Sequence, residues 1–510
     1  MKNPPNILFI LADQLNAKCL GHAGHAHVRT PNLDRLAAEG TAFHHSVCNN
    51  PICTPSRMCF LSGMYAHNHG YYGLGGPRPN MPTVFGHFRA RGYTSAVIGK
   101  SHCPLGWIEN DCDVFEETCV VKERTTGYRR HLHRRGMDDD DHDAVVVDGR
   151  RHRQTLDAAP SALEFADSQE GWIAEECIRF MQQAQADGKP FICQAGLPRP
   201  HQVTAPCQRF WDLYADLDLE LPPTADLDLE AAGKPPHLIA RAALWRRGDW
   251  AIYEPKDFAA ARLRKLHGYF AAISQVDASV GLLFDHLDAT GLRENTIVVF
   301  SSDHGEFACE QGIMEKAPGI GADAVTRIPF IWRGPGIAAG RRLRGGAVES
   351  VDLAPTLCAL AGLPPMRTVD GEDLSTVLGG GAEKPDRIVV TENVWAKSLR
   401  RGGLRYVHYP RTMWPEQYPQ GFCELYDTDA DPWEARNLAL DPEYTALREE
   451  LTNELLEWLL TRQRIVNVVG HNQMGDLRIP GGVQCHGSSL ALDGRIDPRL
   501  LRDRPQRDYC

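Results

Sequence analysis

NILFILADQ, residues 6–14, joins an unbroken apolar run to two polar residues, Asp13 and Gln14. A short continuous apolar run is typical of a parallel strand that is buried on both faces of a sheet. Residues 30–40, TPNLDRLAAEG, then predict a helix, because proline stands in the first turn and Gly40 ends the pattern. A strand, a polar pair and a helix in this order form the unit of a parallel sheet covered by helices.

The same arrangement recurs along the chain. Apolar runs predict further strands at 94–99, 191–195, 296–301 and 328–332, with helical patterns at 83–91, 171–186 and 259–290. This alternation indicates an α/β fold with a large mixed, mostly parallel sheet flanked by helices. Four strands are followed by polar side chains, at 13–14, 100–102, 198–201 and 303–304. Because ligands bind such sheets at the carboxyl ends of the strands, we expect the functional site there.

The chain divides into three predicted parts. Residues 1–385 are predicted to form the large domain that carries the functional site, with a surface insertion at about 124–151 that reads RRHLHRRG and then DDDDHD. Short strands at 388–391, 405–408 and 424–427, followed by a helix at 446–462, predict a smaller α+β subdomain over 386–466 with an antiparallel sheet. Residues 467–510 are rich in Gly and Pro, and we expect an arm that packs on the body or on a neighbouring subunit, as in a homo-oligomer.

Composition excludes several classes of function. The formal net charge of −11 argues against a nucleic-acid partner. No stretch has the length of a membrane span, and the apolar run at 7–12 is too short for a signal peptide. Fifteen cysteines, an odd number without a C-x-x-C pair, are typical of free thiols in a reducing compartment. These features predict a soluble cytoplasmic protein without a nucleic-acid or membrane partner.

The most specific motif is CTPSRMCFLSG, residues 53–63. It resembles the C-x-P-x-R signature of the type I sulfatase family, together with the L-S-G that follows it. The resemblance extends to segments at 30–40, 92–102, 190–201, 298–306, 327–336, 351–357 and 424–439. It implies the alkaline-phosphatase-like fold that sulfatases share with phosphonate monoester hydrolases. It also implies an arylsulfatase-like hydrolase that acts on small-molecule sulfate esters.

The resemblance assigns the nucleophile to Cys53. In this family a separate maturation enzyme oxidises the cysteine to formylglycine, whose aldehyde hydrates to a diol. One hydroxyl attacks sulfur and expels the alcohol, and the second then loses its proton so that sulfate leaves as the aldehyde re-forms. Cys53 also precedes a helix start, where backbone amides favour an anion, and Arg57 one turn later is expected to brace the nucleophile.

The resemblance also implies one divalent metal per active site. Its ligands are expected to be Asp13, Asp303 and His304, with an oxygen of the modified Cys53. Two carboxylates and few soft ligands suit a hard cation, so we expect Ca²⁺, while His304 leaves Mn²⁺ or Mg²⁺ open. Gln14 stands where many sulfatases have a second aspartate. It is expected to contact the sulfate of the substrate or the metal, and it is not counted as a firm metal ligand.

Four cationic side chains complete the expected site. Lys100 is expected to bind sulfate, and His102 to hold the nucleophile. His201 and Lys316 are expected to face the leaving oxygen, and either one is a candidate proton donor. Preorganised cations stabilise the charge that develops on the sulfate oxygens in the transition state.

Three other functions stay open at this point. A phosphonate monoester hydrolase or phosphodiesterase would use the same scaffold, although the pair Lys100 and His102 favours a sulfatase. A binding protein would keep Cys53 unmodified. A two-zinc hydrolase with Thr54 as nucleophile would need more His and Asp ligands than the sequence offers. The histidines at 22, 25 and 27 and the acidic run 138–143 are interpreted as ordinary loop residues. The natural substrate is not predicted.

Overall fold

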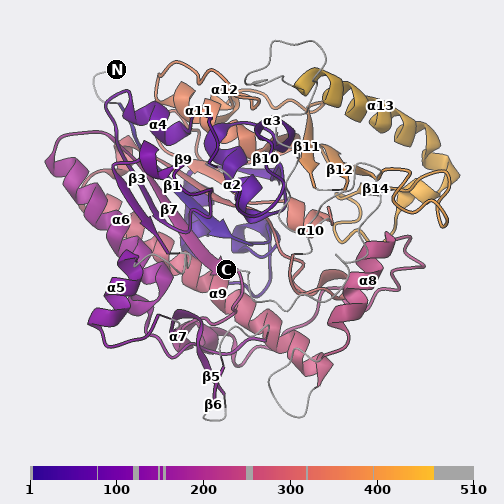
Figure 1. Ribbon diagram of the computed structural model, residues 1–510, viewed down its shortest axis with the longest axis horizontal. Helices are drawn as coiled ribbons and strands as arrows, with labels where there is room; N and C mark the ends of the chain where they lie inside the picture. Colours follow the sequence, from indigo (N-terminus) through magenta and orange to yellow (C-terminus); the bar gives the residue numbers. More distant parts are fainter. Residues whose placement is uncertain are drawn as a thin grey trace.

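A single large sheet organises the computed structural model (Figure 1). The structure describes residues 4–76, 78–118, 126–139, 141–147, 150–152, 157–248, 257–316, 320–393 and 395–463. Eight strands lie in the order β10-β2-β9-β8-β1-β7-β3-β4. Their bounds are β1 Asn6–Asp13, β2 Thr41–Val47, β3 Thr94–Gly99, β4 Val114–Glu117, β7 Phe191–Pro200, β8 Thr296–Ser302, β9 Phe330–Arg333 and β10 Arg341–Glu349.

The sheet is mixed and mostly parallel, as predicted. Strand β1 pairs in parallel with β7 on one side and β8 on the other, so that Ile10 lies beside Ala195 and Phe300. Strands β3 and β4 continue the parallel order, and β10 pairs in parallel with β2. Only β9 runs antiparallel within the described sheet, against both β8 and β2. The carboxyl ends of β1, β3, β7 and β8 therefore meet at one edge.

Helices cover both faces of the sheet. The main ones are α1 Pro31–Glu39, α2 Cys53–Ser62, α4 Val84–Arg89, α6 Gln169–Ala186, α9 Phe258–Ala289 and α11 Leu353–Leu360. Figure 1 shows α6 and α9 along one side and α2, α4 and α11 along the other. Leu8 and Ile10 join the core cluster of α6 and α9, while Phe9 and Leu11 join that of α2, α4 and α11. This alternation explains why β1 reads as a continuous apolar run.

Further helices connect these elements. They are α3 Ala66–His69, α7 Gln208–Trp211, α8 Pro236–Trp245, α10 Asp323–Thr326 and α12 Ser375–Leu378. Among the described residues, no helix combines the length and the apolar character that a membrane crossing requires.

A small antiparallel sheet follows the large one. It consists of β11 Ile388–Glu392, β12 Lys397–Arg401, β13 Leu404–His408 and β14 Cys423–Asp427. Helix α13, Thr445–Arg462, packs Leu451, Leu455 and Trp458 into the same core cluster as Tyr406 of β13. The sequence predicted this α+β arrangement but missed β12. Its sequence KSLRR is rich in charge, and Arg400 is buried only because Asp323 pairs with it.

The insertion at 124–151 was expected to be a surface loop, and this prediction is wrong for its first half. Residues Gly127–Arg134 form helix α5, and the Thr126 side chain caps it by accepting a hydrogen bond from the Arg129 amide (3.2 Å). Tyr128 and Leu132, four residues apart, pack in the core. Strands β5 Val145–Val147 and β6 Arg150–His152 form a small hairpin. The predicted arm at 467–510 lies outside the described residues, and the domain boundaries stay predictions.

Arg387 ties the start of the small sheet to the large one, and this generates a stability prediction. Its Nη1 and Nη2 each lie 2.8 Å from an oxygen of Asp352, and both side chains are at least 90% buried. We expect R387A to lower the free energy of unfolding by about 3–5 kcal/mol, because a buried carboxylate loses its partner. Urea unfolding followed by circular dichroism measures the change.

R89A is the matched control for this prediction. Arg89 pairs with Asp113 at 2.8 Å, but its side chain is 46% exposed. The loss should stay below about 1 kcal/mol, as for other surface ion pairs. Equal losses in R387A and R89A would contradict the role given to Arg387.

Candidate active site

The carboxyl edge of the large sheet brings four predicted segments together. The His201 amide donates to the Asp13 carbonyl (3.1 Å), and the Asp303 amide donates to the Ala12 carbonyl (3.1 Å). The Lys100 amide donates to the Gly196 carbonyl (2.7 Å), so the end of β3 is fixed beside β7. Strand β7 runs on to Pro200, further than predicted, and carries His201 to the same edge. Parallel register thus places residues far apart in sequence within one small volume.

Cys53 is the first residue of helix α2 and is almost completely buried. Its Sγ lies 3.1 Å from Lys316 Nζ, 3.2 Å from His304 Nε2 and 3.9 Å from Asp13 Oδ1. Burial alone would raise the pKa of the Cys53 thiol, but Lys316, His304 and Lys100 together hold it well below its ordinary value. The position is therefore electrostatically suited to a negatively charged group.

Arg57 binds two buried carboxylates at once. Its Nε lies 2.9 Å from Asp303 Oδ2 and its Nη2 2.9 Å from Asp13 Oδ2. Lys100 Nζ is a second partner of Asp13, at 2.8 Å. Burial opposes ionisation of Asp13, yet Lys100, His201 and Arg57 hold the pKa of its carboxyl well below the usual range. The pKa of Asp303 is raised by burial and by the neighbouring Asp13.

One group of side chains fits a metal ion, and it consists of Asp13, Cys53, Asp303 and His304. Each offers one ligand atom, all four are buried, and these atoms lie within 4.8 Å of one another. The His304 Nδ1 lies 3.0 Å from the Gly305 carbonyl, which leaves Nε2 facing the group. This donor set suits a hard divalent cation, because it has two buried carboxylates and an imidazole whose second nitrogen is fixed. An oxygen at position 53 would be a better ligand for such a cation than sulfur.

A second cluster of possible ligands does not fit a cation. His44, His45 and Asp429 also lie close together. Burial and the positive charge of Arg400 lower the pKa of His45 to about 3, and Arg327 adds to this effect. A metal ion would meet the same repulsion. The cluster is better explained as packing between the large sheet and the small one.

The other predicted cations line the same site. Burial, Lys100 and Lys316 lower the pKa of His201 to about 4, so its imidazole is neutral near pH 7. Attraction by Cys53 and Asp13 outweighs burial and raises the pKa of Lys316. Lys316 Nζ also lies 3.1 Å from Gln14 Oε1. His102 adopts a positive φ of 48°, and its carbonyl accepts from Thr54 Oγ1 (2.7 Å). All ten predicted site residues therefore gather in one place.

Two acidic residues of the site were missed by the sequence analysis. Glu117, at the end of β4, accepts from the backbone amides of Ser101 (3.1 Å) and His102 (3.2 Å) and so holds the turn after β3. Glu306 accepts a hydrogen bond from the Gln14 side-chain amide. The position of Glu306 two residues after His304 was an available signal, whereas nothing local to Glu117 indicated its role.

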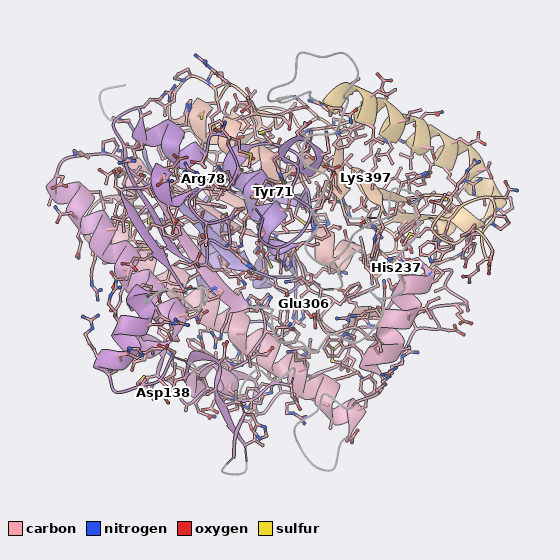
Figure 2. The ribbon with its side chains drawn as sticks, viewed as in Figure 1. Tyr71, Arg78, Asp138, His237, Glu306 and Lys397 are labelled. Carbon is pink, nitrogen blue, oxygen red and sulfur yellow. The ribbon has the colours of Figure 1, made fainter. Side chains whose placement is uncertain are left out.

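The residues interpreted as ordinary loop residues lie elsewhere. Figure 2 shows Asp138, from the acidic run, at the edge of the molecule and Glu306 near its middle. His25 Nδ1 accepts from the backbone amides of His27 (3.2 Å) and Val28 (3.1 Å), so it shapes its own loop. Among the described residues, neither segment contributes to a group that could hold a metal.

Comparison with known proteins identifies the family. The sequence profile of the Sulfatase family matches residues 5–363. The chain is 28% identical over 460 residues to an ulvan-active sulfatase of Formosa agariphila, covering 88% of this chain and 80% of that protein. It is also 28% identical over 453 residues to a choline-sulfatase of Rhizobium meliloti, covering 86% and 83%.

A solved structure gives the same result for the fold. The phosphonate monoester hydrolase of Silicibacter pomeroyi superposes with a TM-score of 0.75, at 23% identity, over 97% of this chain and 99% of that one. At this identity the likeness concerns the fold alone. The family match, the two relatives and the gathered site agree: the chain belongs to the sulfatase family and is a sulfuric ester hydrolase.

Proposed function

We propose that the chain hydrolyses sulfate monoesters, aryl sulfates included, at a formylglycine formed from Cys53. One observation carries the proposal: Cys53 lies at the start of a helix, 3.1 Å from Lys316 and 3.2 Å from His304. A plain buried cysteine has no use for such a surrounding of cations and metal-type ligands. A separate maturation enzyme is the partner that would oxidise it.

Asp13, Asp303 and His304 would hold one divalent cation, and Ca²⁺ is the ion we propose. The cation supplies positive charge at the nucleophile and at the sulfate oxygens. Arg57 binds both aspartates from the side of helix α2, at 2.9 Å each, and so fixes their orientation. The protein thereby keeps two carboxylates aimed at one point without relying on the ion alone.

Formylglycine supplies a hydroxyl nucleophile and a second hydroxyl through which the sulfated residue releases its product. The start of α2 directs backbone amides towards position 53, which favours an anion there. We propose that Lys100 binds sulfate oxygens from the β3 side and that His102 holds the nucleophile. Glu117 fixes the His102 main chain in its positive-φ conformation.

Lys316 is the group that we propose to serve the leaving oxygen. Its Nζ lies 3.1 Å from Cys53 Sγ, and a lysine ammonium, with an ordinary pKa of about 10.4, carries a proton near neutral pH. The pKa of His201 is lowered to about 4 by burial and by the two lysines, so it is neutral at that pH. His201 then donates a hydrogen bond without carrying charge, while Lys316 supplies the proton.

A second candidate function is phosphonate monoester hydrolysis. The fold is shared with the Silicibacter pomeroyi enzyme. Both reactions expel a leaving group from a charged tetrahedral centre. The sequence pair Lys100 and His102 favours sulfate as the main substrate and phosphonate as the lesser one. We also keep the cytoplasmic location and the homo-oligomeric state as predictions, which cell fractionation and light scattering test.

The first prediction of this proposal compares substrates. We expect kcat/KM for an aryl sulfate to exceed kcat/KM for the matching aryl phosphonate monoester. Both esters should carry the same phenol, so that the ratio reports only the transferred group. A larger value for the phosphonate would assign the second candidate function instead.

The second prediction concerns residue 53. Mass spectrometry of the peptide that contains it should give a mass below that of cysteine, since an aldehyde oxygen replaces the sulfur. C53A should lose activity by about 10³-fold or more, as expected for a nucleophile. An unmodified peptide in fully active protein would refute the formylglycine proposal, and a C53A melting curve like that of the wild type excludes misfolding.

The third prediction concerns metal removal. Chelation should lower both activity and melting temperature, and added Ca²⁺ should restore them more fully than Mn²⁺ or Mg²⁺. Binding at 100 times Kd stabilises a folded protein by about 2.7 kcal/mol. D303N removes one proposed ligand, so its melting temperature should not respond to chelator. A wild-type melting temperature that ignores chelator would contradict the metal site.

A further inference from the structure

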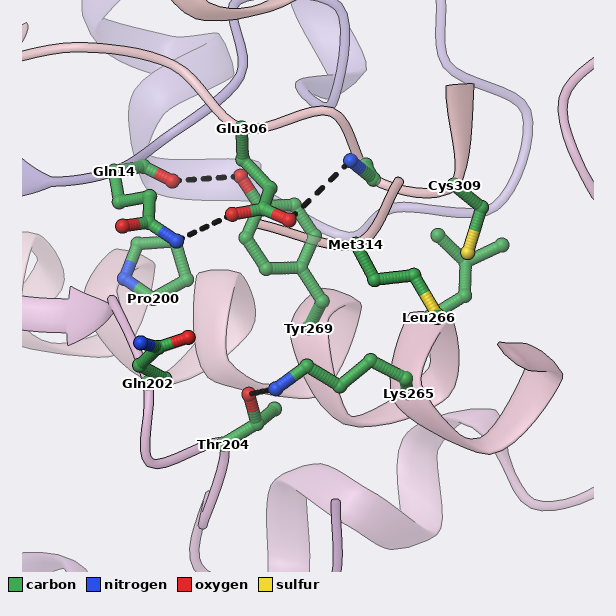
Figure 3. Close-up of a pocket in the computed structure, with 11 residues that line it drawn as sticks. Gln14, Pro200, Gln202, Thr204, Lys265, Leu266, Tyr269, Glu306, Cys309 and Met314 are labelled. Atoms are coloured by element: carbon green, nitrogen blue, oxygen red, sulfur yellow. Dashed lines mark hydrogen bonds between the residues drawn. The ribbon is translucent and has the colours of Figure 1, made fainter. Parts of the chain in front are cut away.

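Gln14 lies between the nucleophile and a buried carboxyl group. Its Oε1 accepts from Lys316 Nζ at 3.1 Å, and Lys316 Nζ in turn lies 3.1 Å from Cys53 Sγ. On the other side, Gln14 Nε2 donates to Glu306 Oε2. Figure 3 shows this contact, with the Gln14 amide facing the Glu306 carboxyl. Both Gln14 and Glu306 are at most 3% exposed.

The chemistry of the two partners fixes the direction of this amide. An ammonium group only donates hydrogen bonds, so the atom that faces Lys316 must be the amide oxygen. Burial raises the pKa of Glu306 to about 7. Its ionised form only accepts, so the amide nitrogen is the atom that faces it, and Lys316 requires the same direction of the amide when Glu306 is protonated. Rotating the amide by half a turn would set two donors against each other at Lys316 and two acceptors against each other at Glu306.

The main chain of Gln14 is held as firmly as its side chain. Its φ is 65°, a left-handed value that is costly for a residue with a side chain and is typical of functional sites. The backbone amide donates to Asp303 Oδ1 (3.0 Å), and the carbonyl accepts from the Tyr269 hydroxyl (2.8 Å). Two hydrogen bonds of the main chain therefore maintain a strained position.

The direction of the Gln14 amide depends on its hydrogen-bond partners. Gln14, Thr204, Lys265, Tyr269 and Glu306 are among the residues lining a small pocket with room for about one water molecule. Figure 3 shows Glu306 on one side of this pocket and Lys265 with Thr204 on the other. Lys265 donates to Thr204 Oγ1 (2.6 Å). A half-turn of the amide about its terminal bond leaves its shape unchanged, so packing does not fix its direction and its hydrogen-bond partners must.

We propose that Glu306 is a positioning residue, which orients the Gln14 amide so that its oxygen holds the Lys316 ammonium at the reacting centre. This inference rests on the proposed function, because Lys316 serves the leaving oxygen there. Glu306 itself touches neither the nucleophile nor the substrate. Its effect reaches the reaction through two hydrogen bonds, one that Gln14 donates to Glu306 and one that Lys316 donates to Gln14.

A reciprocal pair of substitutions tests the inference. In E306Q the new amide can present either of its ends, so the direction of the Gln14 amide is no longer fixed. We expect kcat to fall by about 10- to 100-fold, the usual effect of removing an orienting partner of this kind. KM should change little, because Lys316 acts mainly on charge that develops in the transition state.

Q14E, the other single variant, should also lose activity, because two carboxyl groups then face each other. In Q14E/E306Q the pair is restored with its polarity reversed. The amide at position 306 donates, and the carboxylate at position 14 still accepts from Lys316. We expect the double variant to be at least about tenfold more active than the product of the two single effects.

E310Q is the matched control. Glu310 is also buried and lies four residues further on, but its contacts are with Asn16 (3.2 Å) and Lys18 (2.6 Å) rather than with Gln14. When E310Q is combined with Q14E, the fold-loss of kcat should equal the product of the fold-losses in the two single variants. Melting temperatures of all variants separate loss of folding from loss of positioning.

Q14E, E306Q and the double variant form a double-mutant cycle. Its outcome can be told apart from a failure of the proposed function. Activities are measured with whichever ester, aryl sulfate or aryl phosphonate, the wild type hydrolyses faster. A preference for phosphonate would overturn the proposed substrate, but the double-mutant cycle would still test whether Glu306 positions Gln14. Multiplicative effects of Q14E and E306Q, like those with E310Q, would overturn the inference.

Discussion

Two carboxylates that are fully buried and close together set the main constraint on this molecule. Asp13 and Asp303 end neighbouring strands, and neither could stay ionised in the interior without compensation. Arg57 supplies it by binding both with one guanidinium, whose planar fork reaches two acceptors in fixed directions. Lysine could not replace it, since a single ammonium lacks that geometry. The position of helix α2, and with it of Cys53, follows from this pairing.

The same constraint links the fold to the site. Because β1 is flanked in parallel by β7 and β8, the chain must leave the sheet at one edge after each strand. Asp13 is the last residue of β1, and His201 and Asp303 are the first residues after β7 and β8. Backbone hydrogen bonds of 3.1 Å join these strand ends. The strained φ values of Gln14 and His102 occur where the chain turns away from the sheet. Strain at these turns is offset by the apolar contacts of the strands behind them.

Sequence reasoning succeeded where one local pattern determined the structure. The apolar runs of β1, β3 and β8 predicted buried parallel strands, and the polar residues after them lie together at one edge of the sheet, as expected. It failed where burial depends on a distant partner. Strand β12 is highly charged, and Arg400 enters the interior only because Asp323 is there to meet it. Glu117 was missed for the same reason, since its partners belong to the turn after β3. Helix α5 was missed because basic residues surround its two core positions.

Charge alone does not decide which ester this site prefers. Arg57 and Lys100 bind Asp13, Arg57 also binds Asp303, and Lys316 lies 3.1 Å from Cys53 Sγ, so cations surround the reacting centre. A sulfate monoester and a phosphonate monoester each carry one negative charge, and these cations attract both. We propose that two neutral groups at this centre, His201 and the Gln14 amide, add to the preference for sulfate that the pair Lys100 and His102 gives. A neutral residue at position 14 also separates the Glu306 carboxyl from the substrate, where a further negative charge would repel it. Fixing the direction of that amide is therefore as important to this site as the number of its charges.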